Sequence, residues 1–368
     1  MRVGLIIYES LKTLSGGYLY DRKLIEYLKN RGDQVEIISL KARNYLSHLT
    51  DNVSRQLCER IFQADLDIFL QDELNHPSLF WINQILKMRG YQPAIIAIVH
   101  HLRSSENHPR LLLPIYRRIE RHYLKTLDGF IFNSRATQQD VEKLTGRPAN
   151  AVVAHPGGDR FISQITEMEI EQRAFQPGPI KLLFVGNLIP RKGLHHLLDS
   201  LSLLPPETWR LTIVGRVVGH KSYTVKIRRA VKAKIKTRQI SMLGSVDTLQ
   251  LAEQYRLNHL LVVPSSYEGF GIVYLEAMGF GLPAIATDSG ATAETIINNM
   301  NGFLVQPNAR EELAQRIHQL HLNRDILSQM GMAARGHFLA APTWEDTGTR
   351  IYDFLQKIVG KDERTGGI

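Results

Sequence analysis

Short apolar runs alternate with longer amphipathic stretches along almost the whole chain. Runs of about four to eight residues rich in Val, Ile and Leu predict buried strands, and the stretches between them, apolar on one side only, predict helices. The predicted strands are 1–8, 34–40, 65–70, 94–99 and 128–133 in the first part of the chain and 180–185, 209–214, 260–263 and 284–287 in the second. Regular alternation of strand and helix predicts an α/β fold with parallel sheets.

The segment 166–179 interrupts this alternation. It is polar, charged and punctuated by Pro and Gly, and it carries no strand signal, which is typical of a domain boundary. We therefore expect a first domain at 1–165, a linker at 166–179 and a second domain at 180–343, followed by an amphipathic helix within 344–368. Each domain should be a Rossmann-like parallel sheet with its ligands at the carboxyl ends of the strands.

Composition narrows the class of protein. A chain of 368 residues suits two domains of ordinary size. Its 45 Lys and Arg against 36 Asp and Glu, a net charge of +9, favour an anionic partner: a phosphate-bearing ligand, an anionic membrane surface or nucleic acid. Cys58 is the one cysteine, so no intrachain disulfide forms, and a reducing cytoplasm is favoured. We expect neither a signal peptide nor a transmembrane helix, because no apolar run approaches about 20 residues.

The stretch 260–283 carries the strongest functional pattern. An apolar strand leads into a small, flexible loop, and an amphipathic helix begins after Gly271. Gly269 and Gly271 allow backbone to approach a ligand, and the N–H groups of a helix start suit a diphosphate. Glu268 precedes the helix and Glu276 lies about 7 Å further along its axis. Each carboxylate accepts two hydroxyl hydrogen bonds, so the spacing matches a nucleotide-sugar, although on spacing alone Glu276 is equally a solvated helix residue.

A second pattern follows the predicted strand 180–185. Gly186 opens the turn, and Arg191 and Lys192 lie side by side at a Gly-lined helix entrance. Two adjacent cations in this position form a diphosphate clamp, in which each charge-assisted hydrogen bond contributes ~1.5 to 3 kcal/mol. An ordinary basic turn is the alternative.

Two turns of the first domain also carry candidate residues. Gly16 and Gly17 separate the first strand from a helix, a place where Gly often serves a steric purpose. His100 and His101 follow the strand 94–99, at the strand end where open α/β sheets bind their ligands. Spacing does not choose between the two histidines, and a structural role is the alternative for either.

Two basic stretches predict helices with cationic faces. The stretch 111–127 has an apolar stripe and an arginine-rich stripe, so it is either a peripheral helix on anionic lipid or a solvated face over a core stripe. The stretch 220–240 lacks the aromatic residues typical of nucleic-acid binding, and we expect no nucleic-acid partner. Asp65 and Asp67 lie at a strand mouth without acidic neighbours, so we predict no metal site there.

The string from Glu268 to Glu276, followed by Gly281, Leu282 and Pro283, closely resembles the paired-glutamate signature of the retaining glycosyltransferases of family 4. The resemblance extends over nearly the whole chain and is strongest over 184–302. It implies the GT-B fold, in which two Rossmann-like domains face a central cleft and the last helix crosses back to the first domain. In that family the first Glu contacts the donor sugar and the second the ribose, which by resemblance gives these roles to Glu268 and Glu276.

The resemblance also implies roles for the other candidates. It places Arg191 and Lys192 on the donor phosphates, and His100 against the donor sugar, whereas His101 stands where the family often has Asp. The implied catalytic residues are His100, Glu268, Arg191 and Lys192. The implied donor-binding residues are Gly16, Gly17, Gly186, Arg191, Lys192, Glu268, Gly269, Phe270, Gly271, Ile272 and Glu276.

The implied reaction is transfer of a glycosyl group from a nucleoside diphosphate sugar, with UDP or GDP as the nucleotide, to an acceptor hydroxyl with retained configuration. No metal or other cofactor is expected. The acceptor stays open between a lipid, a sugar and a small metabolite. The alternatives are a sugar-nucleotide epimerase on the same fold and a non-catalytic donor-binding or membrane-associated protein. We expect a cytoplasmic protein, with peripheral contact to the cytoplasmic face of the membrane as the open alternative.

Overall fold

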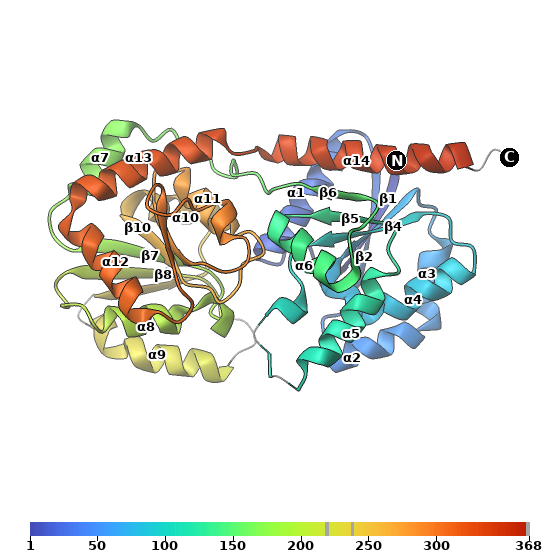
Figure 1. The fold of residues 1–368 in the computed structure, drawn as a ribbon, viewed down its shortest axis with the longest axis horizontal. Helices are drawn as coiled ribbons and strands as arrows, with labels where there is room; N and C mark the ends of the chain where they lie inside the picture. The colour runs from blue at the N-terminus through green and yellow to red at the C-terminus, as the bar shows by residue number, and fades with distance from the viewer. Residues whose placement is uncertain (107, 110, 218–220, 237–238, 366–368) are drawn as a thin grey trace. The chain divides into compact units, whose positions relative to one another are not determined.

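The computed structural model describes residues 1–106, 108–109, 111–217, 221–236 and 239–365 (Figure 1). The chain forms two compact units. The first comprises Met1–Gly157 together with Pro342–Ile368, and the second comprises Gly158–Ala341. The division falls ahead of the predicted linker 166–179, and the last helix belongs to the first unit.

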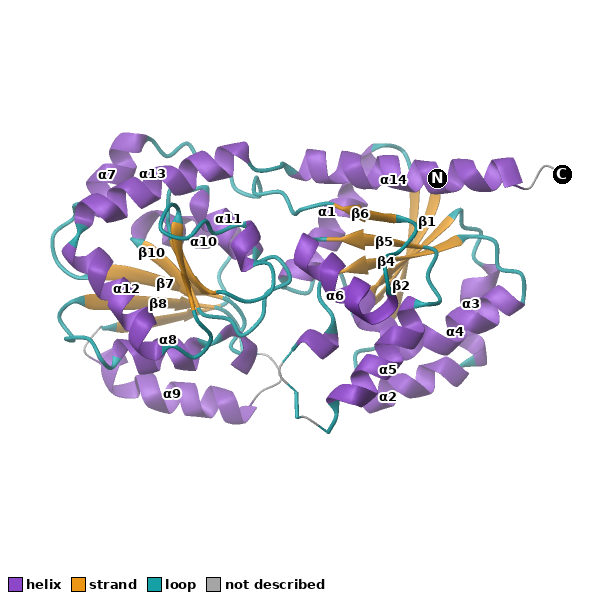
Figure 2. Ribbon diagram, in the orientation of Figure 1, coloured by secondary structure: helices purple, strands orange, loops and turns teal. Residues whose placement is uncertain are grey.

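The first unit is built on a six-stranded parallel sheet in the order β2-β1-β3-β4-β5-β6 (Figure 2). Its strands are β1 (Arg2–Tyr8), β2 (Gln34–Leu40), β3 (Ile68–Asp72), β4 (Ala94–Val99), β5 (Gly129–Phe132) and β6 (Ala151–Val153). β3, β4 and β5 are buried along their whole length, as continuous apolar runs predict for a parallel sheet covered by helices. Because β1 pairs with β2 on one side and β3 on the other, the direction of sheet growth reverses between β1 and β3, which is where such sheets bind ligands.

Helices of the first unit follow each strand and cover the sheet. They are α1 (Gly16–Asn30), α2 (Tyr45–Leu49), α3 (Arg55–Gln63), α4 (His76–Met88), α5 (Leu113–Leu124), α6 (Arg135–Thr145) and α14 (Trp344–Thr365), with 3-10 turns at Thr50–Val53, Glu73–Asn75 and Arg103–Ser105. The terminal helix α14 packs on α1 and β5. The Tyr27 hydroxyl lies 3.0 Å from Thr349 Oγ1, and a Cβ on Gly129 would stand 3.2 Å from Ile358 Cδ1.

The second unit repeats the plan with a six-stranded parallel sheet in the order β12-β11-β10-β7-β8-β9. Its strands are β7 (Ile180–Val185), β8 (Trp209–Val214), β9 (Ile240–Gly244), β10 (Leu260–Val263), β11 (Ala284–Thr287) and β12 (Gly302–Val305). Its helices are α7 (Glu167–Ala174), α8 (Leu194–Leu201), α9 (Lys221–Lys236), α10 (Thr248–Leu257), α11 (Ile272–Met278), α12 (Arg310–Leu322) and α13 (Arg324–Ala340), with 3-10 turns at Pro190–Lys192 and Thr292–Glu294. Here the reversal falls between β7 and β10, so the loops after these two strands lie at the ligand-binding edge.

The predicted α/β fold class is confirmed, and β4, β7, β8, β10 and β11 have the predicted bounds. The segment 166–179, predicted to be the linker between the domains, instead lies within the second unit, and most of it is helix α7. A capping box at Thr166 starts the helix, Ile170 is buried against the second unit, and Arg173 donates to the carbonyl oxygens of Phe280 and Gly281. The polar composition that suggested a linker belongs to the exposed face of this short helix.

β3 begins at Ile68, later than predicted. Asp67 accepts hydrogen bonds from the backbone N–H and the guanidinium of Arg2, and Asp65 forms an ion pair with the same guanidinium. Both carboxylates therefore lie against the guanidinium of Arg2.

α9 covers most of the predicted basic helix 220–240, whose residues 220 and 237–238 lie outside the described part of the chain. Among the described residues, no helix is both long and apolar enough to cross a membrane.

Candidate functional site

The loops after β7 and β10 interlock at the carboxyl edge of the second sheet. Ser266 donates its backbone N–H to the carbonyl oxygen of Arg191 over 2.8 Å. Gly193 has a φ of +71°, and a Cβ there would lie 1.9 Å from the carbonyl oxygen of Pro264. Only glycine fits this contact, because a side chain would collide with fixed backbone and strain φ as well. The sequence motifs around Lys192 and Glu268 are thus held together by main-chain packing.

Glu268 lies at the centre of a charged cluster on these loops. Its Oε1 accepts from Lys192 Nζ and from the Ser265 hydroxyl, each at 2.5 Å, and its Oε2 is 3.8 Å from Arg191 Nη1. Arg191 also donates to the carbonyl oxygen of Tyr267 at 2.7 Å. Burial disfavours the charged carboxylate, but the charges of Lys192 and Arg191 outweigh it and hold the pKa of Glu268 below its ordinary value. Burial lowers the pKa of Lys192, and Glu268 opposes that shift.

Glu276 has a different set of partners. It is 4% exposed, on the buried side of α11, where Oε1 accepts from Arg160 Nη1 at 3.0 Å and Oε2 accepts from the Tyr255 hydroxyl at 2.9 Å. Burial raises the pKa of Glu276 in spite of the opposing effects of Arg160 and Tyr255. The alternative of a solvated helix residue is therefore wrong. Both carboxylate oxygens already hold protein donors, and a ligand hydroxyl would join them through the remaining lone pairs.

The remaining predicted donor-binding residues of this unit mainly shape the loops. Phe270 and Ile272 are buried apolar side chains, and Gly269 is partly exposed beside them. Gly271 is the N-cap of α11 with a φ of +86°, and a Cβ there would meet the ring of Tyr274 at 2.5 Å. α11 is only seven residues long, so a diphosphate would depend on Arg191 and Lys192 more than on the helix dipole. Gly186 lies beside the aliphatic stem of Lys192, 3.5 Å from where its own Cβ would be.

In the first unit, α1 begins at the reversal point of the sheet. Ser15 is its N-cap and accepts from the backbone N–H of Tyr18, and Gly16 and Gly17 form the first helical positions. A Cβ on Gly17 would stand 3.0 Å from the ring of His100. A glycine at position 17 therefore leaves room for the imidazole of His100 beside the helix.

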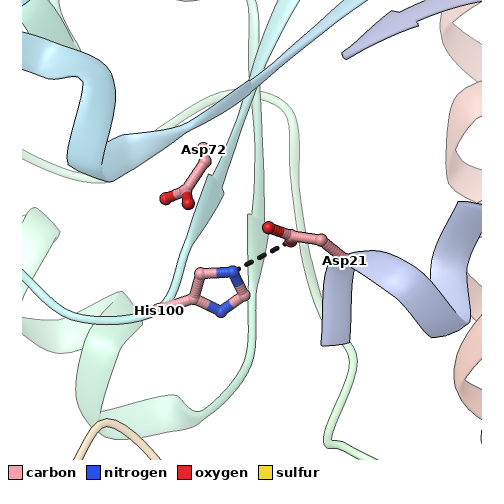
Figure 3. A group of neighbouring side chains, drawn as sticks. All are labelled: Asp21, Asp72 and His100. Carbon is pink, nitrogen blue, oxygen red and sulfur yellow. Dashed lines mark hydrogen bonds and ion pairs between the residues drawn. The ribbon is translucent and has the colours of Figure 1, made fainter. Parts of the chain in front are cut away.

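His100 is paired with a buried carboxylate. Its Nε2 lies 3.0 Å from Asp21 Oδ1, and the carboxylate of Asp72 faces the same ring (Figure 3). Burial alone would lower the pKa of His100, but Asp21, Asp72 and Glu73 outweigh it and raise the pKa to about 9. Burial and the charge of Asp21 raise the pKa of Asp72 to about 7.

His101 has an environment of its own. Its Nε2 lies 3.1 Å from Glu106 Oε1, an ion pair on the loop that follows β4. The two adjacent histidines therefore have different partners, and His100 is the more deeply buried of them.

Two groups of side chains in the described part of the first unit are close enough to share a cation: Asp21, Asp72 and His100, and Glu73, His76 and Glu120. Each imidazole has at least one hydrogen-bond partner within the protein. In the second group His76 Nδ1 is 3.0 Å from the Glu73 carbonyl oxygen and Nε2 is 3.1 Å from the Tyr45 hydroxyl. In the first group the nitrogen that faces the carboxylates is bound to Asp21. Both groups are buried clusters of carboxylates around an imidazole.

Comparison with solved structures identifies the class of fold. Sucrose-phosphate synthase from Thermosynechococcus elongatus superimposes with a TM-score of 0.81 at 19% identity, over 98% of this chain and 99% of that one. Anabaena HepE, solved in complex with UDP and glucose, gives a TM-score of 0.75 at 18% identity over 97% and 99%. The chain thus has the GT-B fold, and the predicted fold is confirmed.

Family models define the group more narrowly. Residues 166–337 match the model of glycosyl transferases group 1, and residues 20–160 match that of Glycosyltransferase Family 4. Both units of the chain are therefore similar to glycosyltransferases of these groups, in agreement with the resemblance that the sequence motifs indicated.

The curated relatives that it matches are distant. A GDP-mannose-dependent α-(1-6)-phosphatidylinositol monomannoside mannosyltransferase of Mycobacterium tuberculosis is 26% identical over 67% of this chain and 66% of that protein. A D-inositol 3-phosphate glycosyltransferase of Pseudarthrobacter chlorophenolicus is 27% identical over 70% and 64%. The alignments thus cover just under two thirds of the length of these relatives.

Sequence reasoning missed several residues that the structure adds to these clusters. Asp21 carried a signal, since it is a charged residue within the apolar stripe that α1 buries. Ser265 lies in the loop already singled out, so its hydroxyl was a visible candidate. Arg160 and Tyr255 carried none, because they reach Glu276 from segments remote in sequence.

Proposed function

We propose that the protein transfers a glycosyl group from a nucleoside diphosphate sugar to an acceptor hydroxyl, with retention of anomeric configuration. The observation that carries the proposal is the cluster of Lys192, Arg191 and Glu268 on two interlocked loops. It offers two cations for a diphosphate and an ionised carboxylate for sugar hydroxyls. The GT-B fold and the complex of Anabaena HepE with UDP-glucose support the same reading.

In this proposal Lys192 and Arg191 bind the donor phosphates. Charge-assisted hydrogen bonds to phosphate contribute about 1.5 to 3 kcal/mol each, so the pair supplies much of the donor affinity. Glu268 accepts from hydroxyls of the sugar, and Glu276 accepts from the ribose with Arg160 and Tyr255 fixing its orientation. His100 is the proposed sugar contact of the first unit, and Gly16 and Gly17, at the start of α1, are the proposed donor-binding residues beside it.

The chemical step exchanges one bond at the anomeric carbon for another. The bond to the phosphate oxygen breaks, the acceptor oxygen bonds on the same face, and the acceptor proton passes to the leaving phosphate. Charge accumulates on the diphosphate as its bond breaks. Arg191 and Lys192 stabilise that charge, so we propose that the reaction needs no metal.

UDP and GDP are the proposed donor nucleotides. The relatives named above include a GDP-mannose-dependent enzyme and the solved structures include UDP complexes, so both belong in the first screen. The proposed acceptor is a sugar, a lipid or a small hydroxylated metabolite. We place the reaction in the cytoplasm.

The lipid alternative has one structural feature to test. Leu111 is 88% exposed and Ile115 is 53% exposed beside the arginines of α5, an arrangement that suits the surface of an anionic membrane. Peripheral contact is supported if the protein binds to vesicles of anionic lipid, if salt weakens this binding, and if the double variant Arg117→Glu/Arg121→Glu no longer binds. Equal behaviour of variant and wild type removes it.

A donor screen tests the function. UDP-, GDP- and ADP-sugars are titrated calorimetrically into wild type, Arg191→Ala and Glu276→Ala, with Arg210→Ala as the matched control, since Arg210 lies on β8 and caps carbonyl groups away from the cluster. One donor should bind to wild type and control and more weakly to both site variants. Folded wild-type protein that binds none of these donors would overturn the proposal.

Two further readouts separate the rival functions. Conversion of the donor sugar without any acceptor indicates an epimerase. Binding without transfer, hydrolysis or conversion, in the presence of sugar and lipid acceptors, indicates a non-catalytic donor-binding protein.

A further inference from the structure

The helix α1 carries a carboxylate where an apolar side chain would be expected. Asp21 is fully buried, between Leu19, Tyr20 and Leu24 of the same buried stripe. Taking a carboxylate out of water is unfavourable, so it is retained in a folded chain only where a partner compensates. The partner is His100, which comes from the loop after β4 and meets Asp21 across the reversal point of the sheet.

The geometry gives the two ring nitrogens of His100 different roles. Nε2 is bound to Asp21 Oδ1 at 3.0 Å. Nδ1 points away from both Asp21 and Asp72 in Figure 3, and it is buried without a hydrogen-bond partner among the described residues. A buried N–H without an acceptor is unfavourable, and an oxygen of a bound ligand would relieve it.

Two further contacts keep the imidazole in this orientation. Gly17 allows the ring to lie directly against the first turn of α1, because any Cβ would press on it at 3.0 Å. The ring of Tyr20 meets it edge-on with centroids 5.4 Å apart, and the Tyr20 hydroxyl is itself anchored on the carbonyl oxygen of Ala154 at 2.8 Å. The ring is therefore held by packing on one helix and by a carboxylate of that helix.

Carboxylates from three elements raise the pKa of His100. They are Asp21 from α1, Asp72 from β3 and Glu73 from the 3-10 turn after β3. Asp21 alone among them is hydrogen-bonded to the ring. A carboxylate on one nitrogen favours the doubly protonated imidazole, whose second N–H can only donate.

We infer that Asp21 is a positioning residue: it holds His100 through Nε2, so that Nδ1–H donates to an oxygen of the transferred sugar. The inference rests on the proposed function for the identity of the ligand. The pairing of Asp21 with His100 does not depend on it, and the two parts are measured separately.

The pairing is measured by NMR titration of His100, assigned by its loss in His100→Gln, in wild type, Asp21→Asn and Asp67→Asn. Asp67 is the matched control. It lies directly before strand β3, which ends at Asp72, and it pairs with Arg2 and not with His100. We expect the pKa of His100 to lie well above its ordinary value in wild type and control, and to fall by about 2 units in Asp21→Asn. A wild-type pKa at or below the ordinary value would overturn the inference even if Asp21→Asn fails to fold.

The role in transfer is measured by a double-mutant cycle with the donor found in the screen. Asp21→Asn should lower kcat/KM about 10- to 100-fold, the worth of one charged hydrogen bond, and move the loss of activity at high pH to lower pH. Asp21→Glu should restore the high-pH limb in part. In a His100→Gln background Asp21→Asn should cost nothing further, because its effect passes through the imidazole.

The outcomes keep the two claims apart. An equal loss from Asp21→Asn with and without His100 shows that Asp21 acts elsewhere and overturns the inference. A shifted His100 pKa with unchanged transfer makes the pair a structural one and also overturns it. Failure of every donor to bind, with the His100 pKa as expected, sinks the proposed function and with it the sugar contact, while the pairing itself stands.

Discussion

Replacing Glu268 with Gln should make the protein bind a nucleoside diphosphate more tightly while it loses transfer. In the structure Glu268 occupies the two cations that we propose for the donor phosphates, with Lys192 Nζ at 2.5 Å and Arg191 Nη1 at 3.8 Å. A free diphosphate has to share these cations with a carboxylate that contributes nothing to its binding. Gln keeps the shape of the side chain and removes the charge.

The magnitude follows from the position of that charge. A unit negative charge about 5 Å from a phosphate repels it by roughly 3 kcal/mol at an effective dielectric of about 20. Part of this gain is lost, because Lys192 is buried and loses the partner that keeps it protonated. We expect UDP or GDP to bind about 10-fold more tightly, which is ~1.4 kcal/mol, and transfer to fall at least about 100-fold because the sugar loses its carboxylate.

Calorimetry at pH 7 and constant ionic strength measures this change. Glu253→Gln is the control, since it makes the same charge change on an exposed position of α10 in the same unit. It should leave both binding and transfer unchanged. Equal or weaker binding of the diphosphate by folded Glu268→Gln would show that Lys192 and Arg191 are not its ligands, and the reasoning would fail.

Three further outcomes are expected. Tyr255→Phe should lower the free energy of urea unfolding by about 1 to 2 kcal/mol, because Glu276 loses a buried donor; an unchanged midpoint contradicts this. Gly193→Ala should lower both stability and donor affinity, because its Cβ would collide with the carbonyl oxygen of Pro264, and wild-type affinity would contradict the interlocked loops. Burial raises the pKa of Glu73 to about 8 from an ordinary 4.5, so the folded state holds that proton more tightly and loses about 1.4 kcal/mol per pH unit as pH rises from about 4.5 to 8. The free energy of unfolding of Glu73→Gln should therefore rise relative to that of the wild type as the pH increases over this range. The same pH dependence in both proteins would contradict the raised pKa.

Much of the candidate site was predictable from local sequence. Glu268 and Lys192 each lie in a loop that directly follows a recognisable apolar strand, and the carboxyl ends of parallel strands share one edge. Their contact is therefore a consequence of strand order as well as of motif. The sequence analysis expected the start of the helix after Gly271 to bind the diphosphate. Because α11 has only seven residues, its dipole supports that expectation less than a longer helix would.

Local sequence did not decide what two segments pack against. The range 166–179 has the composition of a linker, yet Ile170 and Ala174 are buried and make it a helix of the second unit. Glu276 looked like a residue that could equally face solvent. Its burial is set by Arg160 and Tyr255, and no local pattern announces either partner.

The sequence by itself determined the fold class, the bounds of β2, β4, β7, β8, β10 and β11, and the two charged motifs, because hydrophobic periodicity and strand-to-loop transitions are local properties. Tertiary structure alone decided that Asp21 meets His100 and that Glu276 meets Arg160. Each of these pairs joins residues far apart in the chain, and whether a buried charge is neutralised, bound or free for a ligand depends on the partner that folding brings beside it.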